Sequence, residues 1–110
     1  MSERERRVGL NEAVFREVNE RIEDLAERFE LRSQPLDLIC ECGDEDCRER
    51  ISMTHSEYEE VRSDSRQFAV YPGHEYGDIE DVVARREGYD IVRKREGEAA
   101  ELAEASDSRS

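Results

Sequence analysis

All three cysteines of this chain lie within eight residues, in the segment Cys40-Glu-Cys-Gly-Asp-Glu-Asp-Cys47. Zinc in proteins takes four sulfur, nitrogen or oxygen ligands, usually at the corners of a tetrahedron. Because residues i and i+2 of an extended segment face the same side, Cys40 and Cys42 can reach one ion. Gly43 can take a positive φ, so the loop can turn and bring Cys47 round as a third ligand. The Cys-x-Cys-x4-Cys spacing therefore predicts a metal site at the tip of a short hairpin.

The fourth ligand has to come from another part of the chain, which has two histidines, His55 and His74. His74 follows Pro72-Gly73, and a turn after a strand presents an imidazole well. His55 falls in the first turn of a predicted helix, where water can solvate it. We therefore predict a Zn²⁺ site formed by Cys40, Cys42, Cys47 and His74. The alternatives for the fourth ligand are His55, a water molecule, or a carboxylate of Asp44, Glu45 or Asp46.

Two other interpretations of the cysteines are open. Free cysteines are often buried as small hydrophobic residues, but an acidic Gly-Asp-Glu-Asp loop fits that role poorly. A redox pair with a third, resolving cysteine needs thiols that ionise easily, and acidic neighbours oppose this unless a cation compensates them. Iron–sulfur sites usually have four cysteines and other spacings. Metal binding is therefore the favoured interpretation, and thiol redox chemistry is its alternative.

The composition explains why a chain of 110 residues would need a bound metal ion to stabilise its fold. Only 35% of its residues are hydrophobic and 43% are charged, so the core of the one domain that this length allows must be small. Domains with small cores are often stabilised by a metal, a disulfide or a partner chain. Thiols stay reduced in the cytoplasm, where we expect this protein, so a metal is the favoured staple.

A long helix is predicted near the N-terminus. Apolar residues recur there every three or four positions, which is the period of one helix face. They are Phe15, Val18, Ile22, Leu25 and Phe29. The helix should run from about residue 11 to 31 and end before Pro35. Its apolar face either packs on its own domain or pairs, as a short coiled coil, with a second copy or another protein.

Short strands and one short helix are predicted after it. Alternating or β-branched apolar residues predict strands at 36–40, 48–53 and 67–71. Thr54 and Glu57 match a capping box that starts a helix over residues 55–63. Residues 79–95 have helical spacing in part, but β-branched and aromatic residues on both sides of Arg-Glu-Gly favour a hairpin.

The predicted fold is therefore α+β, with a long N-terminal helix, a small antiparallel sheet and one short helix, stapled by a metal site. Residues 10–95 form a single zinc-binding domain, residues 1–9 a flexible N-terminus, and residues 96–110 a disordered acidic tail. The predicted core consists of Phe15, Val18, Ile22, Leu25, Phe29, Leu36, Leu38, Ile51, Tyr58, Val61, Phe68, Val70, Val83, Tyr89 and Ile91.

The net charge of −13 narrows the possible partners. An acidic surface repels phosphate backbones and anionic membranes, so nucleic-acid binding is not expected. The charged N-terminus has no apolar run behind it, and no stretch approaches the roughly 20 apolar residues of a membrane span. We therefore expect a cytoplasmic protein without membrane contact and with a protein partner, which the acidic surface or the long helix would engage.

The motifs of common enzyme classes are absent from the sequence. A zinc ion with four protein ligands is closed to substrate, so the predicted site is structural. We therefore predict a non-enzymatic, zinc-stabilised binding or regulatory module that acts through protein–protein contacts, with a homodimer through the N-terminal helix as one possibility. The alternative is a thiol-based redox or metal sensor that uses the three cysteines.

Five segments together are similar to those of a known group of proteins. They are residues 11–22, the cysteine segment 40–47, Tyr58-Glu-Glu-Val-Arg62, Phe68-Ala-Val-Tyr-Pro-Gly-His74 and residues 89–94. This combination, across residues 10–95, resembles small uncharacterised actinobacterial proteins with a Cys-x-Cys-x4-Cys … Pro-Gly-His pattern. The resemblance implies that the helix, the cysteines and the histidine belong to one module, and it implies no activity.

Overall fold

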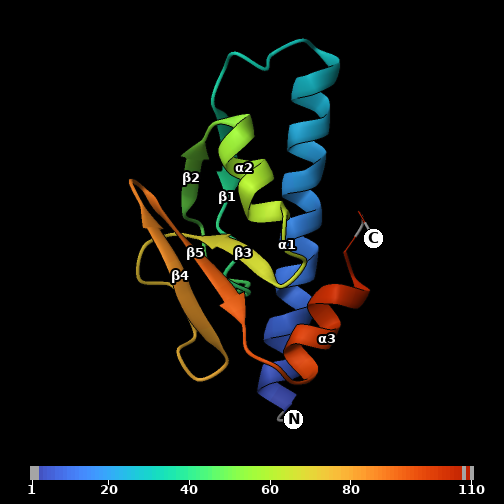
Figure 1. The fold of residues 1–110 in the computed structure, drawn as a ribbon, viewed down its shortest axis with the longest axis vertical. Coiled ribbons are helices and arrows are strands. Elements are labelled where there is room, and N and C mark those ends of the chain that lie inside the picture. The colour runs from blue at the N-terminus through green and yellow to red at the C-terminus, as the bar shows by residue number, and fades with distance from the viewer. Residues whose placement is uncertain (1–2, 108, 110) are drawn as a thin grey trace.

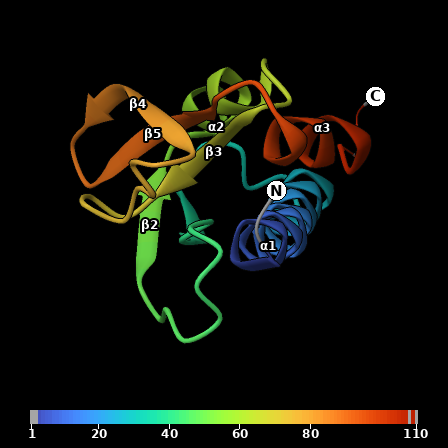
Figure 2. The ribbon, with the colours of Figure 1, turned by 90° about the horizontal axis from the view of Figure 1, so that it is seen from below.

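The computed structural model describes residues 3–107 and 109, which form three helices and five strands (Figure 1). In chain order they are α1 (Glu3–Arg28), β1 (Leu36–Ile39), β2 (Arg50–Met53), α2 (His55–Arg62), β3 (Gln67–Val70), β4 (Glu80–Arg86), β5 (Tyr89–Lys94) and α3 (Glu98–Ala105). The long helix α1 stands beside the strands and α2, and α3 packs against α1 (Figures 1 and 2). This is the α+β arrangement that the sequence predicts.

The strands form two small antiparallel sheets in place of the single predicted sheet. One sheet is the pair β1–β2, and in the other β5 lies between β3 and β4. The hairpin of β4 and β5 confirms the favoured interpretation of residues 79–95. A bulge between Val82 and Ala84 interrupts its register. The residue between them, Val83, is 50% exposed, so its assignment to the core is wrong.

The face that α1 buries is the largest departure from the sequence prediction. Val18, Leu25 and Phe29 are 39%, 52% and 71% exposed, and Phe15 and Ile22 are only partly buried. The buried residues of α1 are instead Val8, Gly9, Glu12, Arg16, Asn19 and Glu23. The prediction that the apolar face packs into the core is therefore wrong for its exposed members.

The polar face is buried because its side chains find partners across the fold. Lys94, whose side chain is fully buried, lies with Nζ 2.7 Å from Glu12 Oε1 and 2.5 Å from Glu80 Oε1. Arg16 donates to the carbonyl oxygens of Ser65 (2.6 Å) and Ala103 (2.7 Å). Buried charges are tolerated when they are paired and hydrogen-bonded in this way. On the neighbouring apolar face Ile22 packs partly against the core, whereas Val18, Leu25 and Phe29 stay exposed.

Both chain ends contain more helix than predicted. The helix α1 begins at Glu3, within the predicted flexible N-terminus. The helix α3 occupies most of the predicted disordered tail and buries Ala99, Ala100 and Ala103. Small alanine side chains allow close helix packing, and the sequence prediction overlooked them because they are weak apolar anchors. Residues 1–2, 108 and 110 of these two predicted segments lie outside the described residues.

The core consists of two clusters that share the second sheet. The first cluster is made of Leu36, Leu38, Ile51, Met53, Tyr58, Val61, Ala69, Tyr89 and Ile91. The second is made of Cys40, Cys42, Phe68, Val70, Val92 and Ala103. Nine predicted core residues are confirmed as buried, namely Leu36, Leu38, Ile51, Tyr58, Val61, Phe68, Val70, Tyr89 and Ile91.

Candidate metal centre

The chain stays extended beyond β1, and this positions the first two cysteines. The N–H of Cys40 donates to Glu49 O (3.2 Å), and the N–H of Glu41 donates to Ala69 O on β3 (2.9 Å). Because side chains alternate along an extended segment, Cys40 and Cys42 share one side and Glu41 takes the other. There the Glu41 carboxylate accepts a hydrogen bond from the Ala69 N–H (2.9 Å). This segment therefore joins the two sheets directly behind the thiols.

Asn19 of α1 holds the same segment in place, and sequence reasoning did not single it out. Its Nδ2 donates to Ile39 O (2.9 Å), and its Oδ1 accepts from the Ile39 N–H (2.9 Å). Nδ2 also donates to the buried carboxylate of Glu41 (2.7 Å), which accepts from the Tyr58 hydroxyl as well (3.2 Å). The sequence does hold one signal for Asn19, because the polar residues from Glu12 to Glu23 recur with the helical period.

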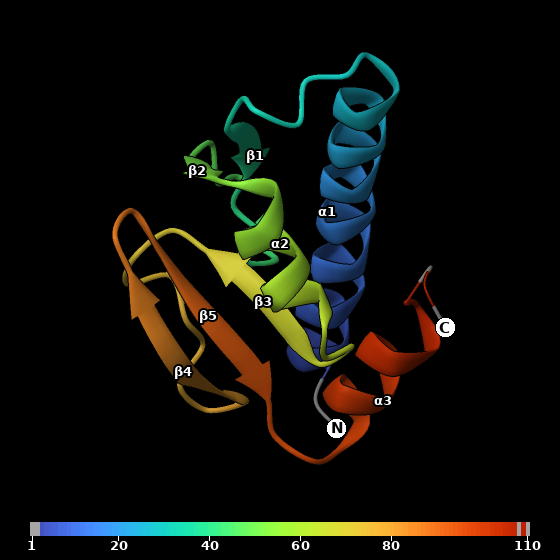
Figure 3. The same ribbon diagram turned by 45° about the horizontal axis from the view of Figure 1, so that its top comes forward.

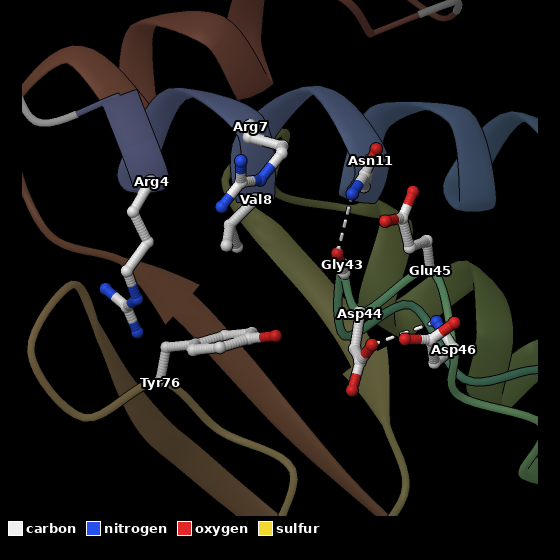
Figure 4. A pocket seen from close by; sticks show the side chains of 9 residues that line it. All are labelled: Arg4, Arg7, Val8, Asn11, Gly43, Asp44, Glu45, Asp46 and Tyr76. Carbon is white, nitrogen blue, oxygen red and sulfur yellow. Dashed lines mark hydrogen bonds between the residues drawn. The ribbon is translucent and has the colours of Figure 1, made fainter.

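The cysteine loop is docked closely on α1. Gly43 has a φ of +82°, and a Cβ at this position would lie 2.8 Å from both Val8 O and Glu12 Cγ. Asn11 Nδ2 donates to Gly43 O (2.9 Å; Figure 4). Glycine is required here both by the positive φ and by this close approach. The turn that leads to Cys47 is therefore fixed against the helix.

The acidic residues of the loop line a surface pocket of about 450 Å³. Figure 4 shows Arg4, Arg7 and Asn11 of α1 along one wall, with Asp44, Glu45 and Asp46 on the loop that faces it. Among the described residues, these three acids are not part of the group that could hold a metal with the cysteines. The structure thus gives no support to a loop carboxylate as the fourth ligand.

A tight turn brings the histidine to the cysteines. Gly73 has a φ of +88°, and the His74 N–H donates to Tyr71 O (3.0 Å). The rings of Tyr71 and His74 lie 5.2 Å apart. The turn at Pro72-Gly73 that the sequence predicts is therefore present, and it is what places His74 beside residues more than 25 positions earlier in the chain.

The structure brings Cys40, Cys42, Cys47 and His74 together, with one potential ligand atom from each within 4.8 Å of the others. His74 Nδ1 lies 3.7 Å from Cys40 Sγ and 3.6 Å from Cys47 Sγ. A tetrahedral zinc ion, bound at its usual distances, would separate sulfur from nitrogen by about 3.5 Å. The three sulfurs and one nitrogen therefore have both the chemistry and the spacing to hold a metal ion.

Backbone groups favour the ionised form of each cysteine. The Tyr71 N–H donates to Cys40 Sγ (3.1 Å), and the backbone groups of Asp44 and Glu49 act to lower the pKa values of Cys42 and Cys47. Hydrogen bonds to a ligand atom orient it and stabilise its negative charge. Such bonds suit three thiolates around a cation better than three neutral thiols packed as hydrophobic residues.

Without a cation the three cysteine thiols differ in pKa. A hydrogen bond from the Cys40 thiol, helped by the backbone and His74, lowers the pKa of Cys42 to about 5. The same hydrogen bond and burial raise the pKa of Cys40, and burial raises the pKa of Cys47. The cluster therefore favours one thiolate near neutral pH, and a bound cation would have to displace the protons of the other two.

The structure does not bring the other histidine to the cysteines. His55 begins α2, where its ring groups with the carboxylates of Glu23 and Glu27. It therefore does not serve as the alternative fourth ligand.

Comparisons of the chain with protein-family models, with curated proteins and with solved structures find no match. The resemblance to the actinobacterial group therefore stays a prediction. None of the helices in the described part of the chain is long and apolar enough to cross a membrane.

Proposed function

We propose that this chain is a non-catalytic binding module stabilised by Zn²⁺, with Cys40, Cys42, Cys47 and His74 as the ligands. The observation that carries this proposal is the match between the sulfur–nitrogen separations of 3.6 and 3.7 Å and tetrahedral coordination. The Tyr71 N–H bond to Cys40 Sγ supports it, as do the backbone groups that favour ionisation of Cys42 and Cys47. In the cytoplasm, where we place the module, the thiols would stay reduced and available to the ion.

Zinc is the metal we favour because of the ligand set. Three thiolates with one imidazole are soft and borderline donors, which suit Zn²⁺ rather than Mg²⁺ or Ca²⁺. Four protein ligands would fill the tetrahedron and leave no position for a reacting water. A closed ion of this kind stabilises a fold and does not catalyse a reaction, which is why we propose a module and not an enzyme.

The test is metal binding by two matched histidine variants. Co²⁺ in place of zinc gives a thiolate-to-metal absorption band only if the cysteines bind it. We expect this band in the wild type and in His55→Ala, and we expect His74→Ala and Cys42→Ser to weaken or abolish it. Absence of the band in the wild type, with three freely alkylated thiols, would refute the metal-stabilised module.

For the partner, we propose a second copy of the chain, docked on the exposed apolar strip of α1. This strip consists of Leu10, Val14, Val18 and Leu25, with Phe29 just beyond the helix. Two of the basic residues near the strip are paired within the helix, Arg21 with Glu17 (3.5 Å) and Arg28 with Asp24 (3.2 Å). These pairs reduce the charge repulsion between two strips, even though each chain is strongly acidic overall.

Sedimentation of the metal-loaded protein tests this contact. We expect the weight-average mass to rise with concentration in the wild type and Val14→Glu to remain monomeric. Val83→Glu, which changes another exposed valine, on β4, is the matched control and should associate like the wild type. A wild-type protein that stays monomeric at every concentration would exclude a second copy as the partner.

A thiol-based sensor is the second candidate function. It is favoured by the proximity of the three sulfurs and by the partial exposure of Cys47. Hydrogen peroxide would take two electrons from two thiolates and two protons from the solvent, forming one disulfide and two water molecules and releasing the zinc ion. Reversible zinc release by peroxide and a thiol reductant would support the sensor, whereas thiols that stay inert in the metal-loaded protein would exclude it.

A further inference from the structure

A second group of potential metal ligands lies between α1 and the start of α2. It consists of Glu23 and Glu27, one turn apart on α1, and His55, the first residue of α2. One ligand atom from each lies within 4.8 Å of the others. Figures 1 and 3 both show the beginning of α2 beside the C-terminal half of α1. The proposed zinc module makes no use of these residues.

The two ring nitrogens of His55 lack hydrogen bonds to the described residues. Both ring nitrogens are shielded from solvent, and neither has a hydrogen-bond partner among the described residues. A neutral imidazole carries one donor and one acceptor, and a polar group that is shielded from water without a partner destabilises the fold. An ion bound to one nitrogen would satisfy the acceptor.

Glu23 offers a buried carboxyl oxygen in the same place. Glu23 is only 4% exposed, and its Oε1 accepts a hydrogen bond from Arg109 Nη2 (2.9 Å). Its Oε2 is buried and has no hydrogen-bond partner in the described part of the chain. Glu27 is exposed at the rim and makes a loose ion pair with Arg32 (3.5 Å). Surface ion pairs contribute little, so Glu27 can turn to an ion at small cost.

The side chains around Glu23, Glu27 and His55 carry more negative than positive charge, which favours a bound cation. Arg62 and Arg109 are paired with surrounding acids, and Arg32 is paired with Glu27. The acids of this network are Glu20, Glu23, Glu27, Glu59 and Asp107. Five carboxylates thus face three guanidinium groups, and a divalent cation would neutralise the excess negative charge.

We propose that Glu23, Glu27 and His55 form a second site, which binds a divalent transition-metal ion such as Zn²⁺. An imidazole nitrogen with two carboxylate oxygens suits zinc or cobalt, whereas Mg²⁺ and Ca²⁺ take oxygen ligands. Three protein ligands leave one position for water, so this ion should exchange more readily than one held by three thiolates and an imidazole. It would also tie α2 to the half of α1 that carries the exposed end of the apolar strip.

The experiment is a Co²⁺ titration of protein that already holds one equivalent of zinc. We expect one Co²⁺ to bind without a sulfur charge-transfer band. His55→Ala and Glu27→Gln should each weaken this binding by at least about tenfold. Glu17→Gln, which changes another glutamate of α1, is the matched control and should bind as the wild type does. Circular dichroism of each variant verifies that the helices are retained.

The outcomes separate this site from the cysteine site. If no further Co²⁺ binds, or if His55→Ala and Glu27→Gln bind it as tightly as Glu17→Gln, the second site is wrong. If the cysteines hold no metal, Co²⁺ added to zinc-free protein would bind without a sulfur band, and its loss in His55→Ala would support the second site alone. The experiment can therefore show that one of the two sites binds no metal while the other does.

Discussion

At the scale of single residues, the candidate metal centre depends on polar side chains placed behind it. Glu41 is fully buried between two cysteines, and burial raises its pKa, while hydrogen bonds from the Ala69 N–H and Asn19 oppose this shift. Asn19 in turn satisfies both backbone groups of Ile39. These bonds hold the extended chain so that the cysteine side chains on either side of Glu41 converge.

We predict that Asn19→Leu destabilises the protein and weakens metal binding. The substitution keeps the size of the side chain but removes the Asn19 partner of the partly buried N–H and C=O of Ile39. The cost is at most about 1–3 kcal/mol for each group. Urea unfolding of the metal-loaded protein measures the loss of stability. Asn11→Leu, which removes one hydrogen bond from the same region, is the control and should have the smaller effect. Equal effects would contradict the role given to Asn19.

The proton balance of the cysteines gives a second prediction at this scale. At pH 7 Cys42, with a pKa of about 5, is a thiolate, whereas Cys40 and Cys47, with raised pKa values, keep their protons. Because zinc binds thiolates, its binding should release about two protons per ion, and its affinity should fall as the pH is lowered. Calorimetry in two buffers that differ in ionisation enthalpy measures this number. Release of no proton would argue against the three thiolate ligands.

At the scale of elements, α1 shows where sequence reasoning succeeds and where it fails. The strands, the capping box at Thr54 and the turn before His74 follow from local chemistry, and the structure has them all. The buried face of α1 does not follow, because an apolar strip and a polar strip share the helical period. Only the partners of Glu12, Arg16 and the other polar residues, which come from distant segments, decide which strip turns inward.

The candidate site also combines features that are local in the sequence with features that depend on packing. Three cysteines in one loop and a histidine in a turn are visible in the sequence, because the spacing and the turn chemistry are local. Asn19 and the pairing of His55 with Glu23 are not visible, because they depend on how α1 packs against β1 and α2. The contribution of α3 is hidden for a related reason, since its alanines gain their packing value only when another helix is close.

The buried ion triad of α1, β4 and β5 gives a prediction at this scale. Lys94 is the only lysine of the chain, and Lys94→Met would leave the carboxylates of Glu12 and Glu80 without their cation. Removing one partner from a buried ion pair costs about 3–5 kcal/mol. Burial is the largest influence on the Glu12 carboxyl group and already raises its pKa. Loss of Lys94 would raise this pKa further.

The pH dependence of this variant follows from the sign of that shift. A carboxyl group whose pKa is higher in the folded state stabilises the fold below its unfolded pKa, and this contribution is lost as the pH rises through the folded pKa. We therefore expect the deficit of Lys94→Met to be larger at pH 8 than at pH 5 in chemical denaturation. Arg95→Met, which removes an exposed ion pair, is the control and should cost little at either pH. A deficit in Lys94→Met that does not change with pH would contradict the triad.

At the scale of the whole molecule, the two core clusters are coupled through the strands they share. On β3, Phe68 and Val70 belong to the cluster that contains the cysteines, while Ala69 between them belongs to the other. On β5, Ile91 and Val92 are divided in the same way. Loss of order on one side of this sheet therefore removes the backbone that supports the other side.

This coupling predicts how the molecule responds to removal of its metal. A chelator should lower the stability of the entire described fold, and the protein should unfold in one cooperative step, because neither cluster keeps its strands alone. Far-ultraviolet circular dichroism follows the helices, while the fluorescence of the tyrosines, which include Tyr58 and Tyr89 of the first cluster, follows the core. We expect the two signals to change at the same denaturant concentration, which is lower without metal. If chelation changes the tyrosine signal and the helices at different denaturant concentrations, the clusters are independent and the zinc stabilises only its own loop.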